Sequence, residues 1–202
     1  FCLIENVEQY FKVDENAFYT NSEGKKMAKS VHGKSYDRYV KAKEQLSMQP
    51  SEISLIIDYV NEFLETIGVS KVENPIVTPQ DIDYQKIAER YNLTDERDII
   101  WMKFTTSGFL GVVATSNDVG FDYPTSSDDY DLPGEKTRWK YTTSSILLHK
   151  LGQKWDERFV LVFPLSKDIN CKYNRHQIEL GIGKYLVKMG VPILDYYSHN
   201  YH

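Results

Sequence analysis

The sequence predicts an α+β fold (mixed α/β) in which helices pack on a mixed β-sheet. Apolar residues spaced three and four apart are typical of helices, and β-branched or aromatic runs bounded by turns are typical of strands. The helical pattern predominates before residue 75, and both patterns occur after it. We therefore expect a helical N-terminal arm or subdomain over residues 1–74 and an α/β core over residues 75–202, together forming one compact unit.

The clearest N-terminal element is a helix that begins near Pro50. Its apolar residues recur at helical spacing as far as Gly68: Ile53, Ile56, Ile57, Val60, Phe63, Leu64 and Ile67. Glycine commonly follows a helix because it adopts the left-handed conformation without a steric penalty. A looser helical pattern over Lys25–Leu46, interrupted by Gly33, predicts a second and more solvated helix before it.

The middle of the chain predicts one helix followed by a β-meander. A helix over Thr78–Tyr91 is expected because a threonine stands at its N-cap and Pro79 at its first position. Strand-like runs over Asp98–Phe104 and Phe109–Thr115 are joined by the turn Thr-Thr-Ser-Gly, which predicts a β-hairpin. Val119–Tyr123 is expected to be the third strand.

Two helix–strand units complete the predicted fold. A helix over Lys136–Leu151 precedes the apolar run Phe159–Phe163, and a helix over Asn174–Met189 precedes Val191–Tyr197. The asparagine that opens the second helix and Gln177 have the spacing of a capping box. Helical connections between strands commonly join parallel strands, so we expect parallel pairing beside the antiparallel hairpin.

The composition excludes several classes of protein. The chain has 202 residues, of which 41% are hydrophobic, and this argues against wholesale disorder. Cys2 and Cys171 are too few for a disulfide framework, which favours a reducing compartment. No apolar run reaches the ~18 residues that a membrane span needs. We expect a soluble, cytoplasmic protein without membrane contact, and, because residue 1 is Phe rather than Met, a piece of a longer chain.

Charge is distributed unevenly along the chain, whose formal net charge is -5. Residues Asp81 to Glu135 include four Lys or Arg and twelve Asp or Glu. Residues Lys136 to His202 include eleven Lys or Arg and five Asp or Glu. A basic C-terminal third suits a phosphate or an acidic partner. It also suits neutralisation of the preceding acidic stretch within one fold, and both interpretations remain open.

A segment of alternating cations and aromatic residues begins that basic third. Lysine and arginine neutralise phosphates, and tryptophan stacks on unpaired bases, so the segment predicts contact with nucleic acid. Cations on the last helix would extend the patch if the two helices lay side by side. The predicted nucleic-acid-binding residues are Lys136, Arg138, Trp139, Lys140, Arg175 and Lys184. The alternative is the ordinary start of an amphipathic helix.

A candidate catalytic site follows the last predicted strand, where Asp195 and His199 stand close together in the sequence. Ligand sites in open sheets favour the carboxyl ends of strands, and a carboxylate beside an imidazole can transfer protons. Alternatively, Asp195 faces solvent and the chain end frays.

The order of elements from Thr78 onward resembles the core of metal-dependent nucleases of the restriction-endonuclease type. Such enzymes hold a divalent cation with an aspartate and a following acidic-x-lysine motif. The resemblance implies that Asp118 or Asp122 is the first metal ligand, so both are predicted metal ligands. The predicted catalytic residues are Asp122 together with Asp195 and His199 of the strand-end site. The sequence departs from the pattern because no Glu-x-Lys follows on a strand; Glu135 and Lys136 are adjacent.

Taken together, these features predict an intracellular binding or accessory protein, bacterial or phage in type, that acts through protein or nucleic-acid contacts and needs no cofactor. The alternative is a Mg²⁺-dependent nuclease or phosphoester hydrolase. Convergence of Asp122 and Asp195 in one pocket would favour the alternative.

Overall fold

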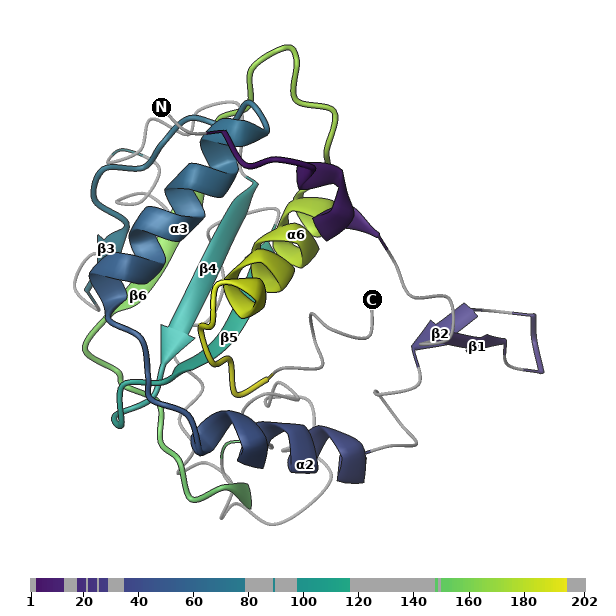
Figure 1. Ribbon diagram of the computed structural model, residues 1–202, viewed down its shortest axis with the longest axis vertical. Coiled ribbons are helices and arrows are strands. Elements are labelled where there is room, and N and C mark those ends of the chain that lie inside the picture. Colours follow the sequence, from purple (N-terminus) through teal and green to yellow (C-terminus); the bar gives the residue numbers. More distant parts are fainter. Residues whose placement is uncertain are drawn as a thin grey trace.

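A computed structural model describes most of the predicted elements. The described residues are 3–12, 18–20, 22–24, 26–28, 35–78, 89, 98–116, 148 and 150–195. Two long helices, α3 (Ile53–Thr66) and α6 (Arg175–Lys188), cover one face of a four-stranded sheet (Figure 1). The predicted α+β class is confirmed. Among the described residues, no helix combines the length and the apolar character that crossing a membrane requires.

The sheet is antiparallel throughout its named strands. Its strands lie in the order β3-β6-β4-β5. Their bounds are β3 (Ile76–Val77), β4 (Ile99–Phe104), β5 (Leu110–Ser116) and β6 (Val160–Pro164). The pairing of β4 with β5 confirms the predicted hairpin.

Of the parallel pairing predicted for Val191–Tyr197, the described residues show only an isolated bridge between Leu110 and Ile193. The amides of Leu194 and Asp195 donate to the carbonyls of Leu110 and Gly111, at 2.9 and 3.0 Å. The segment that follows α6 therefore runs beside β5, at the edge of the sheet.

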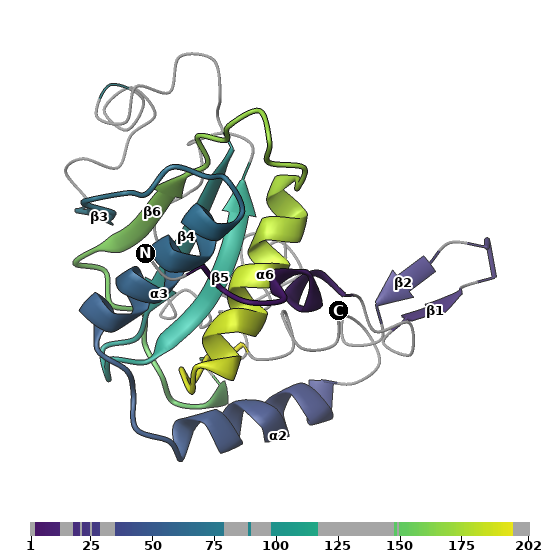
Figure 2. The same ribbon diagram turned by 45° about the horizontal axis from the view of Figure 1, so that its top comes forward.

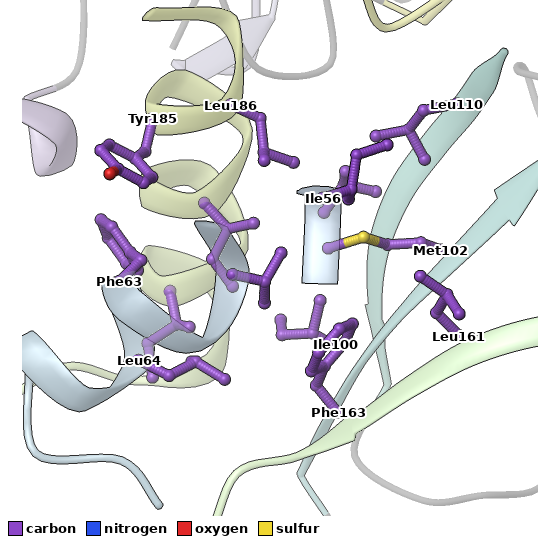
Figure 3. Close-up of a cluster of buried hydrophobic side chains, with 14 of the residues drawn as sticks. Ile56, Phe63, Leu64, Ile100, Met102, Leu110, Leu161, Phe163, Tyr185 and Leu186 are labelled. Carbon is purple, nitrogen blue, oxygen red and sulfur yellow. The ribbon is translucent and has the colours of Figure 1, made fainter. Parts of the chain in front are cut away.

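The main core lies between the sheet and its two helices, on what we call the helix face (Figure 3). Its members are buried apolar side chains from both helices and three strands. They include Ile56, Phe63, Leu64, Ile100, Met102, Leu110, Leu161, Phe163, Tyr185 and Leu186. The apolar spacing predicted both helices correctly, and α3 belongs to the same core as the sheet.

The ends of the two helices follow the predicted local signals. The Asn174 side chain accepts from the amide of Gln177 at 2.9 Å, and the Gln177 side chain accepts from the amide of Asn174 at 3.0 Å. This confirms the capping box. Gly68 and Gly190, which follow the helices, have φ of 83° and 86°, a left-handed conformation that glycine adopts most readily.

The N-terminal region is less helical than predicted. A 3-10 helix, η1 (Val7–Phe11), is followed by the hairpin of β1 (Phe18–Thr20) and β2 (Lys26–Ala28), which projects from the main body (Figure 2). Helix α2 spans Ser35–Leu46. The single helix predicted over Lys25–Leu46 is therefore wrong in its first part, because β2 obtains its backbone hydrogen bonds from β1.

The opposite face of the sheet, here called the outer face, has a smaller apolar cluster. Its buried members are Phe109, Val112, Leu148, Trp155 and Leu194. Leu46 at the end of α2 packs against this cluster. The two faces thus have separate cores.

Several predicted elements lie wholly or largely outside the described residues. They are the helix over 78–91, the strand over 119–123 and the helix over 136–151. Within them, Glu89, Leu148 and Lys150 are helical.

Candidate functional site

Three of the predicted site residues lie in the described part of the chain: Asp195, Arg175 and Lys184. The others lie outside it: Asp118, Asp122, Lys136, Arg138, Trp139, Lys140 and His199. Both the convergence of Asp122 with Asp195 and the basic-aromatic surface therefore remain predictions.

Asp195 is buried, with 1% of its surface exposed, and it acts electrostatically on Glu179 of α6. Burial, together with the negative charge of Asp195, raises the pKa of Glu179 to about 7, and the positive charge of Arg175 opposes the rise. Glu179 consequently exchanges a proton near neutral pH, which is what a general acid or base requires. Sequence reasoning selected Asp195 but missed Glu179, which has no distinctive motif.

Arg175 joins the start of α6 to the start of β4. Its Nη1 lies 3.8 Å from the carboxylate of Asp98, and the Nζ of Lys167 lies 3.5 Å from the same carboxylate. The Arg175 side chain is 22% exposed, and its Nη1 is buried without a hydrogen bond among the described residues. One carboxylate therefore serves two cations, and Arg175 acts largely within the fold.

Lys184 is also engaged internally, because its ammonium donates to the backbone carbonyl of Lys12. It stands about two and a half helical turns after Arg175, which places the two cations on opposite sides of α6. Arg175 and Lys184 therefore do not contribute to one continuous basic surface of α6.

A second unusual group, Lys103, lies on the outer face beneath Trp155. Only 5% of Lys103 is exposed, and its Nζ lies 4.6 Å from the centroid of the Trp155 ring. Burial lowers the pKa of Lys103 to about 8, and the charge of Glu157 opposes this effect. Sequence reasoning missed Lys103; the signal was a single charge within the apolar strand Ile99–Phe104.

Trp155 is positioned by close backbone contacts. A β-carbon on Gly111 would lie 2.3 Å from the Trp155 ring, so glycine is required for the ring to reach the strand. Thr105 and Trp155 form an antiparallel bridge, and the Asp156 amide donates to the Phe104 carbonyl at 2.7 Å. The segment thus lies directly on the β4–β5 hairpin.

A third feature is a pocket of about 370 Å³ at the C-terminal end of α3. The charged residues that line it are Glu8, Glu65, Asp168 and Lys172. The free carbonyls at the C-terminus of a helix add partial negative charge. The pocket is consequently acidic.

Two exposed aliphatic residues adjoin, in the sequence, residues that line or contact this pocket, and we call them its rim. Ile169, which is 99% exposed, lies between lining residues Asp168 and Asn170. Leu3, which is 58% exposed, precedes Ile4, whose amide donates to the lining residue Thr66 at 3.3 Å. The feature therefore combines a concave acidic surface with apolar contacts beside it.

Comparisons with known proteins returned no matching family model, no matching curated protein and no matching solved structure. Within the described ranges, no three His, Cys, Asp or Glu side chains are grouped to hold a metal ion. The function is therefore argued from the geometry of this chain itself.

Proposed function

We propose that this chain is an intracellular binding protein that contacts another protein through the end of the molecule at the C-terminus of α3. The observation that supports this proposal is the rim of the acidic pocket. Of the large apolar side chains in the described part of the chain, the two most exposed, Ile169 and Leu3, belong to segments that adjoin this one pocket.

The loop that carries Ile169 is held in place, so its exposure is a property of the folded chain. The Asp168 amide donates to the Gly68 carbonyl at 2.8 Å, and the Asp168 carboxylate accepts from the amides of Asn170 and Cys171. An isoleucine left fully in water forgoes roughly 1.5–3 kcal/mol of burial free energy. A partner that covers Ile169 would recover this free energy. The loop is already ordered, so binding would not have to order it.

A protein partner is favoured over nucleic acid at this surface. The carboxylates of the pocket and the C-terminus of α3 both repel phosphate groups. Contact with nucleic acid would instead use the predicted segment Lys136, Arg138, Trp139 and Lys140, and it is a competing outcome of the test.

The test places a photo-crosslinking amino acid at position 170 in cells that express the chain, with position 55 on α3 as the matched exposed control. We expect a discrete protein adduct from position 170 and none from position 55. The Ile169→Asp substitution should abolish the adduct without lowering the melting temperature, because Ile169 makes no core contact. An adduct with nucleic acid, equal adducts from both positions, or none from position 170 would contradict the proposal.

The second candidate is a Mg²⁺-dependent phosphoester hydrolase, which the proximity of Glu179 and Asp195 favours. Here Glu179 would transfer the proton, and Asp195 would act together with the predicted ligands Asp118 and Asp122. The purified chain, incubated with Mg²⁺ and DNA, RNA or bis(nitrophenyl) phosphate, should then turn over substrate. Asp195→Asn and Asp122→Ala should abolish turnover, whereas the exposed control Asp168→Asn should not. No turnover on any of these substrates would exclude this candidate for phosphoesters.

A further inference from the structure

Lys103 occupies a position that a charged ammonium tolerates poorly. Its side chain is almost completely buried on the outer face, and in the described part of the chain its nitrogen contacts the Trp155 ring and forms no salt bridge. A buried cation without a hydrogen-bonding anion loses most of its hydration free energy. Contact with an aromatic face restores only part of that loss.

Among the described residues, few other charged groups are close enough to compensate. The segment carrying Trp155 contributes Glu157, whose negative charge favours protonated Lys103, and the exposed Lys154. Asp156 on the same segment is paired with Arg158 at 2.7 Å. The strands beside Lys103 are apolar at the paired positions, and Asp195, bound through its amide to Gly111, acts on Glu179.

The cover over Lys103 is a defined structural unit. The Trp155 ring lies against Gly111, and residues 154–156 bond to the hairpin through the Thr106 and Asp156 amides. The Trp155 ring lies over the Lys103 nitrogen, so displacement of this segment would remove one cover between the ammonium and water. The protonation of Lys103 and the position of Trp155 are therefore coupled.

We propose that Lys103 and Trp155 form a proton-controlled closure of the outer face, in which neutral Lys103 keeps the Trp155 segment on the hairpin and protonated Lys103 favours its displacement into water. The neutral amine is buried at low cost, whereas the ammonium must be hydrated. Because burial lowers the pKa of Lys103 from 10.5 to about 8, displacement of the segment takes up a proton between these two pH values. The closure is independent of the binding surface at α3, since it lies on the outer face.

The experiment measures acrylamide quenching of Trp155 fluorescence between pH 6 and pH 10 in the full chain. Trp101→Phe and Trp139→Phe leave Trp155 as the reporter, and circular dichroism confirms the fold at each pH. Quenching should increase as the pH falls from about 10 to about 8 and level off below that. Within this range, the ratio of open to closed forms should rise about tenfold per pH unit, because opening takes up one proton.

Three variants separate the closure from a general effect of pH. Lys103→Met should give weak quenching at every pH, whereas Lys103→Arg, which stays charged, should give strong quenching throughout. Glu157→Gln should extend the increase in quenching to lower pH, because loss of that negative charge lowers the pKa of buried Lys103 further. An unchanged transition in Lys103→Met, or no transition in the parent protein, would overturn the proposal.

Hydrogen exchange provides a readout on the unsubstituted protein if a variant fails to fold. After correction for intrinsic rates, exchange of the Thr106 and Asp156 amides should accelerate, relative to the Leu165 amide, as the pH falls toward 8. The Leu165 amide donates to the carbonyl of Asp98 at the start of β4. Parallel behaviour of the three amides would count against the closure.

Discussion

On the helix face of the sheet, Ile100 and Met102 of β4 pack against α3 and α6 in a large apolar core, whereas on the outer face Trp101 and Lys103 of the same strand lie beside a smaller cluster. Alternate residues of β4 thus point to opposite faces of the sheet, where they lie in different environments. The helix face gains stability from dense apolar contact. The outer face buries an ammonium at a cost in stability, which makes that face sensitive to pH.

The largest effect should come from emptying the helix-face core. Phe163→Ala removes a fully buried ring and should lower the free energy of unfolding by about 3–5 kcal/mol. Urea denaturation at pH 7 measures this change. Phe109→Ala, in the smaller outer cluster, should cost less; an equal loss would remove the distinction between the two faces.

The next largest effect should have the opposite sign and belong to the outer face. Lys103→Met should raise the free energy of unfolding by roughly 2–3 kcal/mol at pH 7, because the buried cation is removed. The lowered pKa means that the folded state of the parent binds fewer protons than the unfolded state between pH 8 and 10.5. The stability of the parent should therefore rise across this range while that of the variant does not. Urea denaturation of parent and variant at several pH values measures this difference. If the free energy of unfolding depended on pH in the same way in both proteins, Lys103 would not be a buried cation with a lowered pKa.

A smaller effect of opposite pH dependence is expected from Glu179. Its raised pKa means that the folded state binds more protons than the unfolded state between pH 4.5 and 7. The parent should lose stability as the pH rises through this range. Glu179→Gln should remove that loss and be roughly 1–2 kcal/mol more stable at pH 8, a value reduced for partial solvent screening. Thermal denaturation at pH 5 and pH 8 provides the comparison; identical slopes for variant and parent would argue against a buried proton on Glu179.

The smallest effect concerns the N-terminus of α6, the helix that covers the helix face. Asn174→Ala removes half of the capping box and should cost about 1 kcal/mol in chemical denaturation. Asn170→Ala is the matched control, because the hydrogen bond assigned to Asn170 uses its backbone amide. A larger loss from the control than from Asn174→Ala would mean that the cap contributes little.

The prediction from sequence succeeded where the signal is local. The stripes of α3 and α6, the capping box at Asn174 and the hairpin of β4 and β5 were all found, because each depends on residues a few positions apart. The helix expected over Lys25–Leu46 was wrong in its first part, since the pairing of β2 with β1 outweighed a weak helical pattern. Asp195 was selected for its position after an apolar run, and its effect on Glu179 makes it a member of the candidate site.

The sequence by itself determined the α+β class, the bounds of its two main helices and the antiparallel hairpin, because hydrogen bonding and apolar periodicity within these segments are properties of near neighbours. Only the tertiary structure decided that β6 lies between β3 and β4, that Trp155 covers Lys103 and that Glu179 lies within electrostatic range of Asp195. Those relations depend on which segments, distant from one another in the sequence, pack together and exclude water. A lysine in a strand and a glutamate on a helix have ordinary pKa values until such packing removes their hydration.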